Sequence, residues 1–102
     1  MKKIKTARFK EIPASQIFYA LSDPVRIEIV QALLKTDETS CGDCKTALSK
    51  STMSHHFKVL RENGLIEKRT IGTTHFISLR QNEIEKRMPG LLLAISRLKN
   101  PI

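Results

Sequence analysis

The sequence predicts a small, mainly α-helical domain that carries one β-hairpin. Apolar residues recur at helical spacing in four segments, and a stretch rich in β-branched residues with a central glycine interrupts them at residues 66–79. The 102 residues, 40% of them hydrophobic, are enough for one globular domain. The longest apolar run, residues 91–95, is too short to cross a membrane, and no signal peptide follows the basic start. We therefore expect a cytoplasmic protein with no membrane partner.

Two helices are expected before residue 36. Pro13 opens the first, which runs through Leu21 with Ile17, Phe18 and Leu21 at helical spacing. Asp23 is a good cap for a second helix, and Pro24 suits its first position. This helix is predicted to reach about Lys35, with an apolar stripe made of Val25, Ile29, Ala32 and Leu33.

The middle of the chain predicts a loop at residues 36–43, at most a short helix at residues 44–48, and then a longer helix. Ser49 caps this longer helix, which runs from Lys50 to about Asn63 and ends at Gly64. Met53, Phe57 and Leu60 recur at spacings of four and three, so we expect them to face the core. The opposite side would then carry Thr52, Ser54, His55, Lys58 and Arg61.

The rest of the chain predicts a hairpin and a final helical region. Residues 66–70 and 74–79 are the expected strands, with a turn that contains Gly72. Asn82, with Glu85 three residues later, resembles a capping box, and Pro89 is expected to begin the last helix. One apolar face of this region contains Ile84, Met88, Leu91, Leu92, Ile95 and Leu98.

A short helix, a turn, a capped helix and a following hairpin together predict a winged helix-turn-helix. In that motif the second helix lies in the DNA major groove. The formal charge of +8 favours a polyanionic partner, although charge alone is equally consistent with a solvated surface. Likewise, the start of the capped helix on its own would be an ordinary exposed helix start. The order of the elements therefore favours double-stranded DNA as the partner over a merely solvated surface.

The candidate DNA-binding residues divide by the kind of contact that they can make. Long basic side chains are expected at phosphates: Lys50, Lys58, Arg61, Lys68 and Arg69. Short polar side chains and an imidazole are expected at base edges: Ser51, Thr52, Ser54 and His55 on the helix, with Thr73 and Thr74 at the wing tip. His56 either contacts phosphate or fixes the helix from its buried edge, and we favour the second. His75 on the second strand is expected to be exposed and not a ligand.

Two stretches, "ALSDPVRIEIVQALL" and "SKSTMSHHFKVLRENGLIEKRTIGTTHFISL", resemble the ArsR-type winged-helix regulators. The resemblance covers about residues 14 to 80. It implies a homodimer that binds a palindromic operator and represses transcription, with the first and last helices in the dimer interface. The candidates there are Ile17, Phe18, Leu91, Leu92 and Ile95. Alternatively, Leu91, Leu92 and Ile95 cover the core of the monomer. The expected division is a basic arm at residues 1–12 and a DNA-binding and dimerisation domain at residues 13–102.

The two cysteines, Cys41 and Cys44, lie where many relatives carry metal-binding cysteines. The resemblance implies a soft or transition metal ion there, although the relatives' motif has one residue between the cysteines and this chain has two. Two thiols cannot complete a four-coordinate zinc site alone. A redox-active thiol pair and two inert thiols remain as alternatives. The sequence therefore identifies no certain cofactor, and a soft or transition metal ion is one possibility. The family's second metal site is not carried over, since the last helix has no histidine.

Two other functions fit the sequence less well than DNA binding does. A winged helix can bind protein or RNA, but this use would favour exposed apolar residues on the recognition helix, and the sequence has none there. An enzyme is not expected, because there is no glycine-rich phosphate loop and Cys41, Asp43 and His55 form no catalytic pattern.

Overall fold

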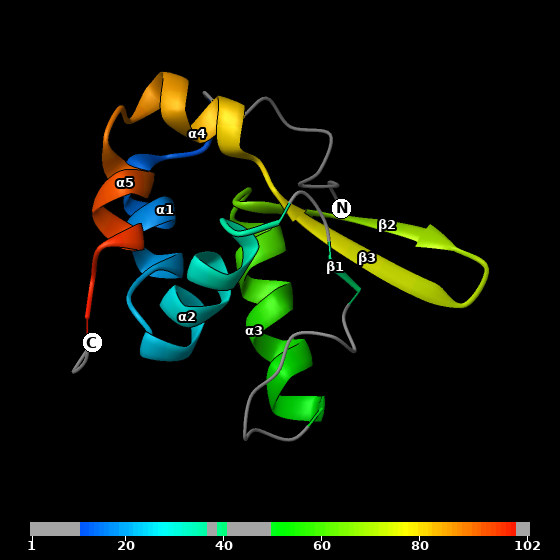
Figure 1. The fold of residues 1–102 in the computed structure, drawn as a ribbon. Coiled ribbons are helices and arrows are strands. Elements are labelled where there is room, and N and C mark those ends of the chain that lie inside the picture. Colours follow the sequence, from blue (N-terminus) through cyan, green and yellow to red (C-terminus); the bar gives the residue numbers. More distant parts are fainter. Residues whose placement is uncertain (1–10, 37–38, 41–49, 100–102) are drawn as a thin grey trace.

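The computed structural model describes residues 11–36, 39–40 and 50–99. Its helices and strands follow in the order α1 (Ala14–Ala20), α2 (Pro24–Leu33), β1 (Thr39–Ser40), α3 (Lys50–Glu62), β2 (Ile66–Ile71), β3 (Thr74–Leu79), α4 (Gln81–Arg87) and α5 (Leu91–Ser96). Helices gather on one side, and the β2–β3 hairpin projects away from them (Figure 1). Within the described ranges, no helix is long and apolar enough to span a bilayer. The predicted mainly helical fold with one hairpin wing is confirmed.

The first two helices begin where the sequence predicts. Pro13 precedes α1, and Asp23 caps α2 by accepting hydrogen bonds from the backbone N–H groups of Val25, at 2.8 Å, and Arg26, at 3.4 Å. These bonds satisfy two amides that have no partner inside the helix. The predicted apolar stripe of α2 needs one correction, since Ala32 is exposed and Val30 is buried instead.

The end of α3 is a tight, fully hydrogen-bonded stop. Gly64 has a positive φ of 83°, its N–H donates to the Arg61 carbonyl, and the Leu65 N–H donates to the Leu60 carbonyl at 2.9 Å. This pair of bonds is the Schellman motif, in which a left-handed residue turns the chain back over the last helical turn. Leu60 and Leu65 are both buried, so the turn brings the chain directly from α3 into the core and on to β2.

The sheet has three strands in the order β1-β3-β2, and both pairs are antiparallel. In the hairpin, Ile66 pairs with Leu79 and Ile71 with Thr74, so two residues form the loop. Gly72 has a φ of 62° and Thr73 a negative φ, as in a type II′ turn. The strand β1 was not predicted, because residues 36–43 read as a loop. Two residues carry no periodicity, and β1 exists only because β3 offers it a free edge.

The region after the hairpin differs from the prediction in two places. Asn82 lies inside α4 and does not cap it; the helix begins after Arg80, which has no side-chain capping bond. Arg80 instead forms a bidentate pair with Glu83, with N–O distances of 2.6 and 3.0 Å, and lies 3.7 Å from Glu67 on β2. The pair with Arg80 holds the pKa of Glu83 below its usual value of 4.5. The last helix, α5, begins at Leu91 after Gly90, not at Pro89.

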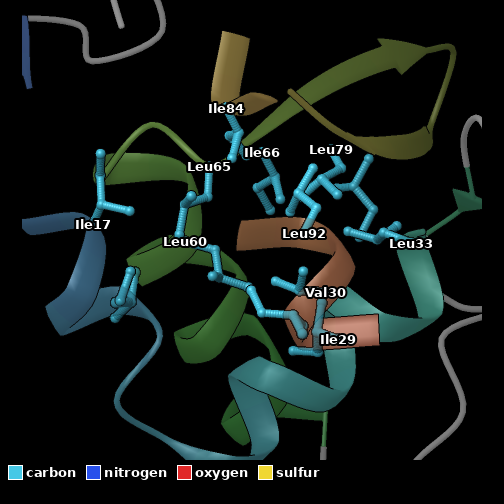
Figure 2. Packing of buried hydrophobic residues seen from close by; sticks show 14 of the residues in the cluster. Ile17, Ile29, Val30, Leu33, Leu60, Leu65, Ile66, Leu79, Ile84 and Leu92 are labelled. Atoms are coloured by element: carbon cyan, nitrogen blue, oxygen red, sulfur yellow. The ribbon is translucent and has the colours of Figure 1, made fainter. Parts of the chain in front are cut away.

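One hydrophobic core joins the helices to the base of the hairpin (Figure 2). Its fully buried side chains are Ile17, Val30, Leu33, Leu60, Leu65, Ile66, Ile77 and Ile84. They come from α1, α2, α3, both hairpin strands and α4, and α5 adds Leu92 and Ile95. Ile12 is also buried, so the predicted boundary between arm and domain at residue 12 falls inside the packed structure.

Removing the α2 cap is expected to destabilise the fold measurably. Asp23→Ala leaves two helix amides without their acceptor and should lower the free energy of unfolding by about 1 kcal/mol. Asn82→Ala is the matched control, because Asn82 is exposed within α4 and should change it by less than about 0.5 kcal/mol. Urea denaturation of both variants measures the difference. An equal loss for the two variants would show that the Asp23 cap contributes nothing specific.

Two glycines with positive φ should respond differently to alanine. A Cβ on Gly64 would collide with the Ile12 side chain, whereas a Cβ on Gly72 would meet open space. Gly72→Ala should therefore cost only the left-handed strain, about 1–2 kcal/mol, and Gly64→Ala more, because overpacking adds about 1–3 kcal/mol. Urea denaturation again measures both. A Gly64→Ala variant as stable as Gly72→Ala would contradict the packing of Ile12 over this turn.

Candidate nucleic-acid interface

The helix α3 is divided sharply between a buried and an open side. Met53, Val59 and Leu60 are buried, and Phe57 is half-buried, as the spacing predicted for three of these four. On the open side Ser51, Ser54, His55 and Lys58 follow one another at spacings of three, one and three, which keeps them on neighbouring rows of the helix surface. Thr52 is exposed too, but it projects about 100° away from Ser51 around the axis.

The basic residues of α3 are partly engaged within the helix. Lys58 is exposed and lies 4.0 Å from Glu62 one turn later, which is a weak surface ion pair. Arg61 is half-buried. The side chain of Lys50 lies outside the described part, although the helix begins at that residue. The N-terminal half of the open side therefore offers hydroxyls and an imidazole, and its C-terminal half a lysine.

The two neighbouring histidines of α3 lie in different environments. His55 is exposed, whereas His56 is buried and its Nδ1 lies 3.3 Å from Nη1 of the buried Arg26 on α2. This placement favours the predicted role of His56 in fixing the helix from its buried edge. Sequence reasoning missed Arg26 as its partner, although Arg26 is part of the quoted "DPVR" stretch.

Cross-strand pairs fix the orientation of the wing's polar side chains. Arg69 pairs with Phe76 in the hairpin register, and its guanidinium lies over the Phe76 ring at 5.3 Å from the ring centre. A cation over a ring face is attracted by the ring quadrupole, so the aromatic ring supports the exposed arginine. On the other face of the hairpin, Thr70 Oγ1 and His75 Nδ1 are 2.9 Å apart. The role of Phe76 was not predicted, because register cannot be read before the turn is known.

The register also separates two predicted phosphate contacts. Lys68 pairs with Ile77 and therefore lies on the face of the hairpin that carries the core residues Ile66 and Leu79. Arg69 lies on the opposite face, with Phe76, Ile71 and Thr74. All of the predicted wing residues, namely Lys68, Arg69, Thr73 and Thr74, are exposed. At the tip an exposed apolar residue, Ile71, closes the turn beside Gly72.

The predicted dimer residues are distributed unevenly between the core and the surface. Ile17, Leu92 and Ile95 are buried within the subunit at 0%, 7% and 5% exposure, so they have almost no surface left for a partner. Leu91 is half-buried, and Phe18 is exposed. Tyr19, Leu93 and Leu98 are also exposed and were not among the predicted dimer residues. Leu92 and Ile95 therefore fit the alternative, in which the apolar face of the last helix covers the core of the monomer.

The predicted thiol site lies outside the described residues. Cys41 and Cys44, together with the short helix at residues 44–48 and the Ser49 cap, fall in the segment 41–49. Across the ranges that the structure describes, no three His, Cys, Asp or Glu side chains are grouped closely enough to hold a metal ion.

Comparison with known proteins places this arrangement in a family. A model of a helix-turn-helix domain matches residues 21–69. The uncharacterized HTH-type transcriptional regulator YceK of Bacillus subtilis is 42% identical over 76% of this chain and 81% of its own. The arsenical resistance operon repressor of the same organism is 33% identical over 82% of each chain. A solved structure of an ArsR family transcriptional regulator superposes with a TM-score of 0.66 over 72% of this chain and 82% of its own; at 17% identity it shows the fold alone.

The family model matches α2, α3 and the start of β2, and the relatives extend over most of the chain. This chain therefore belongs to the ArsR-type family of winged helix-turn-helix, DNA-binding transcriptional regulators.

Proposed function

We propose that this protein represses transcription as a homodimer that binds a palindromic operator. The observation that carries the proposal is the open side of α3, where short polar side chains lie over a helix whose other side is buried in the core. Short side chains let a helix approach base edges closely, and a helix held by the core presents them in a fixed register. The relatives' names, which include a repressor, support the direction of regulation.

The interface divides its work between the helix and the wing. Ser51, Ser54 and His55 are placed to read bases, and Thr52 lies to one side of them. Lys58 and Arg69 supply charge for phosphates, and Arg69 is held in place by the Phe76 ring. Lys68 points to the other face of the hairpin, so the wing can contact phosphates on both of its sides. The chain's net charge of +8 adds long-range attraction to DNA.

The dimer is proposed to form through α1 and α5. Four of the five large exposed apolar residues among the described ones lie on or just beyond these helices: Phe18, Tyr19, Leu93 and Leu98. Both helices lie on the side of the molecule away from the hairpin tip (Figure 1). A contact there would cover the apolar side chains and leave two copies of α3 and the wing available to DNA. Two-fold symmetry of the protein would then match a palindromic site.

The alternative functions gain less support from the geometry. Ser51, Thr52, Ser54, His55 and Lys58 are the exposed residues over the first turns of α3, which does not favour a protein-binding use of this helix. A metal or redox response through Cys41 and Cys44 stays a prediction. A double Cys→Ser variant that binds the operator but no longer responds to zinc, cadmium, arsenite or peroxide would support it.

Substitutions of base-reading residues and substitutions of phosphate-contacting residues should differ in their effect on sequence specificity. Ser54→Ala and His55→Ala should weaken operator binding more than binding to a scrambled duplex, since a lost base contact removes about 1–3 kcal/mol of discrimination. Lys58→Ala and Arg69→Ala should weaken both similarly and lower the slope of log K against log salt by about one. Titrations of each variant on both duplexes at several salt concentrations measure this.

Two controls sharpen that test. Glu62→Gln removes the acid that pairs with Lys58 and should strengthen binding to both duplexes. Phe76→Leu removes the ring under Arg69 and should reproduce a part of the Arg69→Ala loss. Equal losses on operator and scrambled DNA for Ser54→Ala and His55→Ala would show that α3 does not read the sequence.

The oligomeric state should depend on exposed residues of α5 and not of the wing. Leu93→Asp places a charge on the proposed interface without disturbing the subunit core, because Leu93 is 55% exposed. We expect a folded monomer with weaker operator binding, measured by sedimentation velocity and circular dichroism. Ile71→Asp is the matched control, at 54% exposure on the wing, and should remain dimeric. A dimeric Leu93→Asp variant would exclude this part of α5 from the interface.

A further inference from the structure

The side chain of Arg26 is a buried cation that connects its own helix, α2, to α1 and α3. It belongs to α2 and is 6% exposed. Its Nε donates to the Ala20 carbonyl at 2.7 Å and its Nη2 to the Tyr19 carbonyl at 3.4 Å, both at the end of α1. The guanidinium also lies 5.4 Å from the centre of the Tyr19 ring. Arg26 thus closes the C-terminal end of α1, where carbonyl groups lack helical partners and a positive charge is favoured.

The remaining contact of Arg26 reaches the recognition helix. Its Nη1 lies 3.3 Å from Nδ1 of His56, which is 7% exposed. A guanidinium only donates hydrogen bonds, so Nδ1 must be the acceptor. An imidazole whose Nδ1 accepts carries its proton on Nε2 and is neutral. A hydrogen bond from Arg26 Nη1 to Nδ1 therefore needs the tautomer of His56 that carries its proton on Nε2.

We propose that the Arg26–His56 link positions α3 for DNA reading, and that it holds only while His56 is neutral, so that acidification weakens operator binding through His56. A second proton would place an N–H donor and a positive charge against the guanidinium, and the link would break. His56 directly follows the open-side residue His55 on α3, and the two rings lie 5.6 Å apart. A shift of α3 at this point would move the reading side chains. The inference rests on the proposed operator binding.

Among the described residues, the side-chain contacts of Arg26 and His56 include no carboxylate. The side chain of Arg26 is contacted by two backbone carbonyls, the Tyr19 ring and His56. From the start of α2 the Asp23 carboxylate accepts from backbone amides and not from the guanidinium. On α3 itself the neighbouring titratable group is His55. An added proton on His56 would thus meet one buried cation and one imidazole.

The two adjacent histidines should respond to acid with opposite signs. His55 is exposed on the face proposed to meet DNA, and a proton there adds attraction to phosphates, so binding should strengthen as pH falls. A proton on His56 opposes Arg26, so binding should weaken. The wild type shows only the sum of the two effects on DNA binding. One histidine must therefore be replaced to measure the effect of the other. His75 remains in every variant and cancels from the comparison.

Operator titrations at pH 7.5 and pH 5.5 separate the two histidines. In His55→Gln, affinity should fall by about 3- to 10-fold on acidification, because one linked proton changes binding by at most about tenfold per pH unit. In His56→Gln, affinity should rise on acidification. The double variant should change by less than about 2-fold. Since glutamine retains a carbonyl acceptor but does not titrate, His56→Gln should bind better than His56→Ala at pH 7.5.

A second arm measures the link without DNA. If the folded state disfavours the added proton on His56, the unfolded state binds more protons, and stability falls as pH falls. The urea midpoint of the wild type should drop between pH 7.5 and pH 5.5 by roughly 0.3–0.6 M more than that of His56→Gln. Glu83 does not affect this comparison between pH 7.5 and pH 5.5. Its pKa is lowered below 4.5, so the stability that it contributes is lost only at lower pH.

The outcomes are distinguishable. A fall in affinity for His55→Gln together with the larger urea shift of the wild type supports the link. A His55→Gln variant whose affinity is unchanged or rises on acidification overturns it, as does an equal urea shift in wild type and His56→Gln. Failure of every variant to bind any operator at either pH overturns the proposed function instead, and the urea arm then decides the link alone.

Discussion

The structure depends on how α3 is anchored, because this one helix must be fixed by the core and yet leave a side open to a partner. Its end is held by the turn at Gly64, which sends Leu65 and Ile66 straight into the core beside Leu60. Its first half is held by Met53 in the core and by His56 against Arg26. Between these anchors the open side carries polar side chains that take little part in packing. The exposed surface is thereby rigid without being buried.

The same turn connects the helix to the wing. Only Asn63, Gly64 and Leu65 separate α3 from β2, and the backbone of Leu65 also accepts a hydrogen bond from the Arg80 N–H where the hairpin ends. Arg80 in turn joins Glu67 on β2 to Glu83 on α4. The helix and both ends of the hairpin are therefore connected through a few residues at one place. Any movement of α3 should carry the base of the wing with it.

Sequence reasoning predicted the elements that depend on local chemistry. The cap at Asp23, the stop at Gly64 and the turn at Gly72 each need one residue type at one place, and all three were found there. It failed where distant partners decide. Asn82 looked like a cap, but the chain enters α4 earlier because Arg80 is held by Leu65, Glu67 and Glu83. The strand β1 exists through its pairing with β3. At the candidate interface the open side of α3 was predictable from periodicity, whereas the pairs Arg26–His56 and Arg69–Phe76 required the fold.

The division of α3 also has a consequence for how such a protein can diversify. The side chains proposed to read bases, Ser51, Ser54 and His55, are exposed, while those that fix the helix, Met53, His56 and Leu60, are buried. Because exposed substitutions away from special contacts usually change stability by less than about 0.5 kcal/mol, the reading positions can vary with little effect on folding. Gene duplication followed by substitution at these few sites would give paralogues that share one scaffold and recognise different operators. In this helix the buried positions that fix it and the exposed positions proposed to read bases alternate along the chain with hardly any overlap.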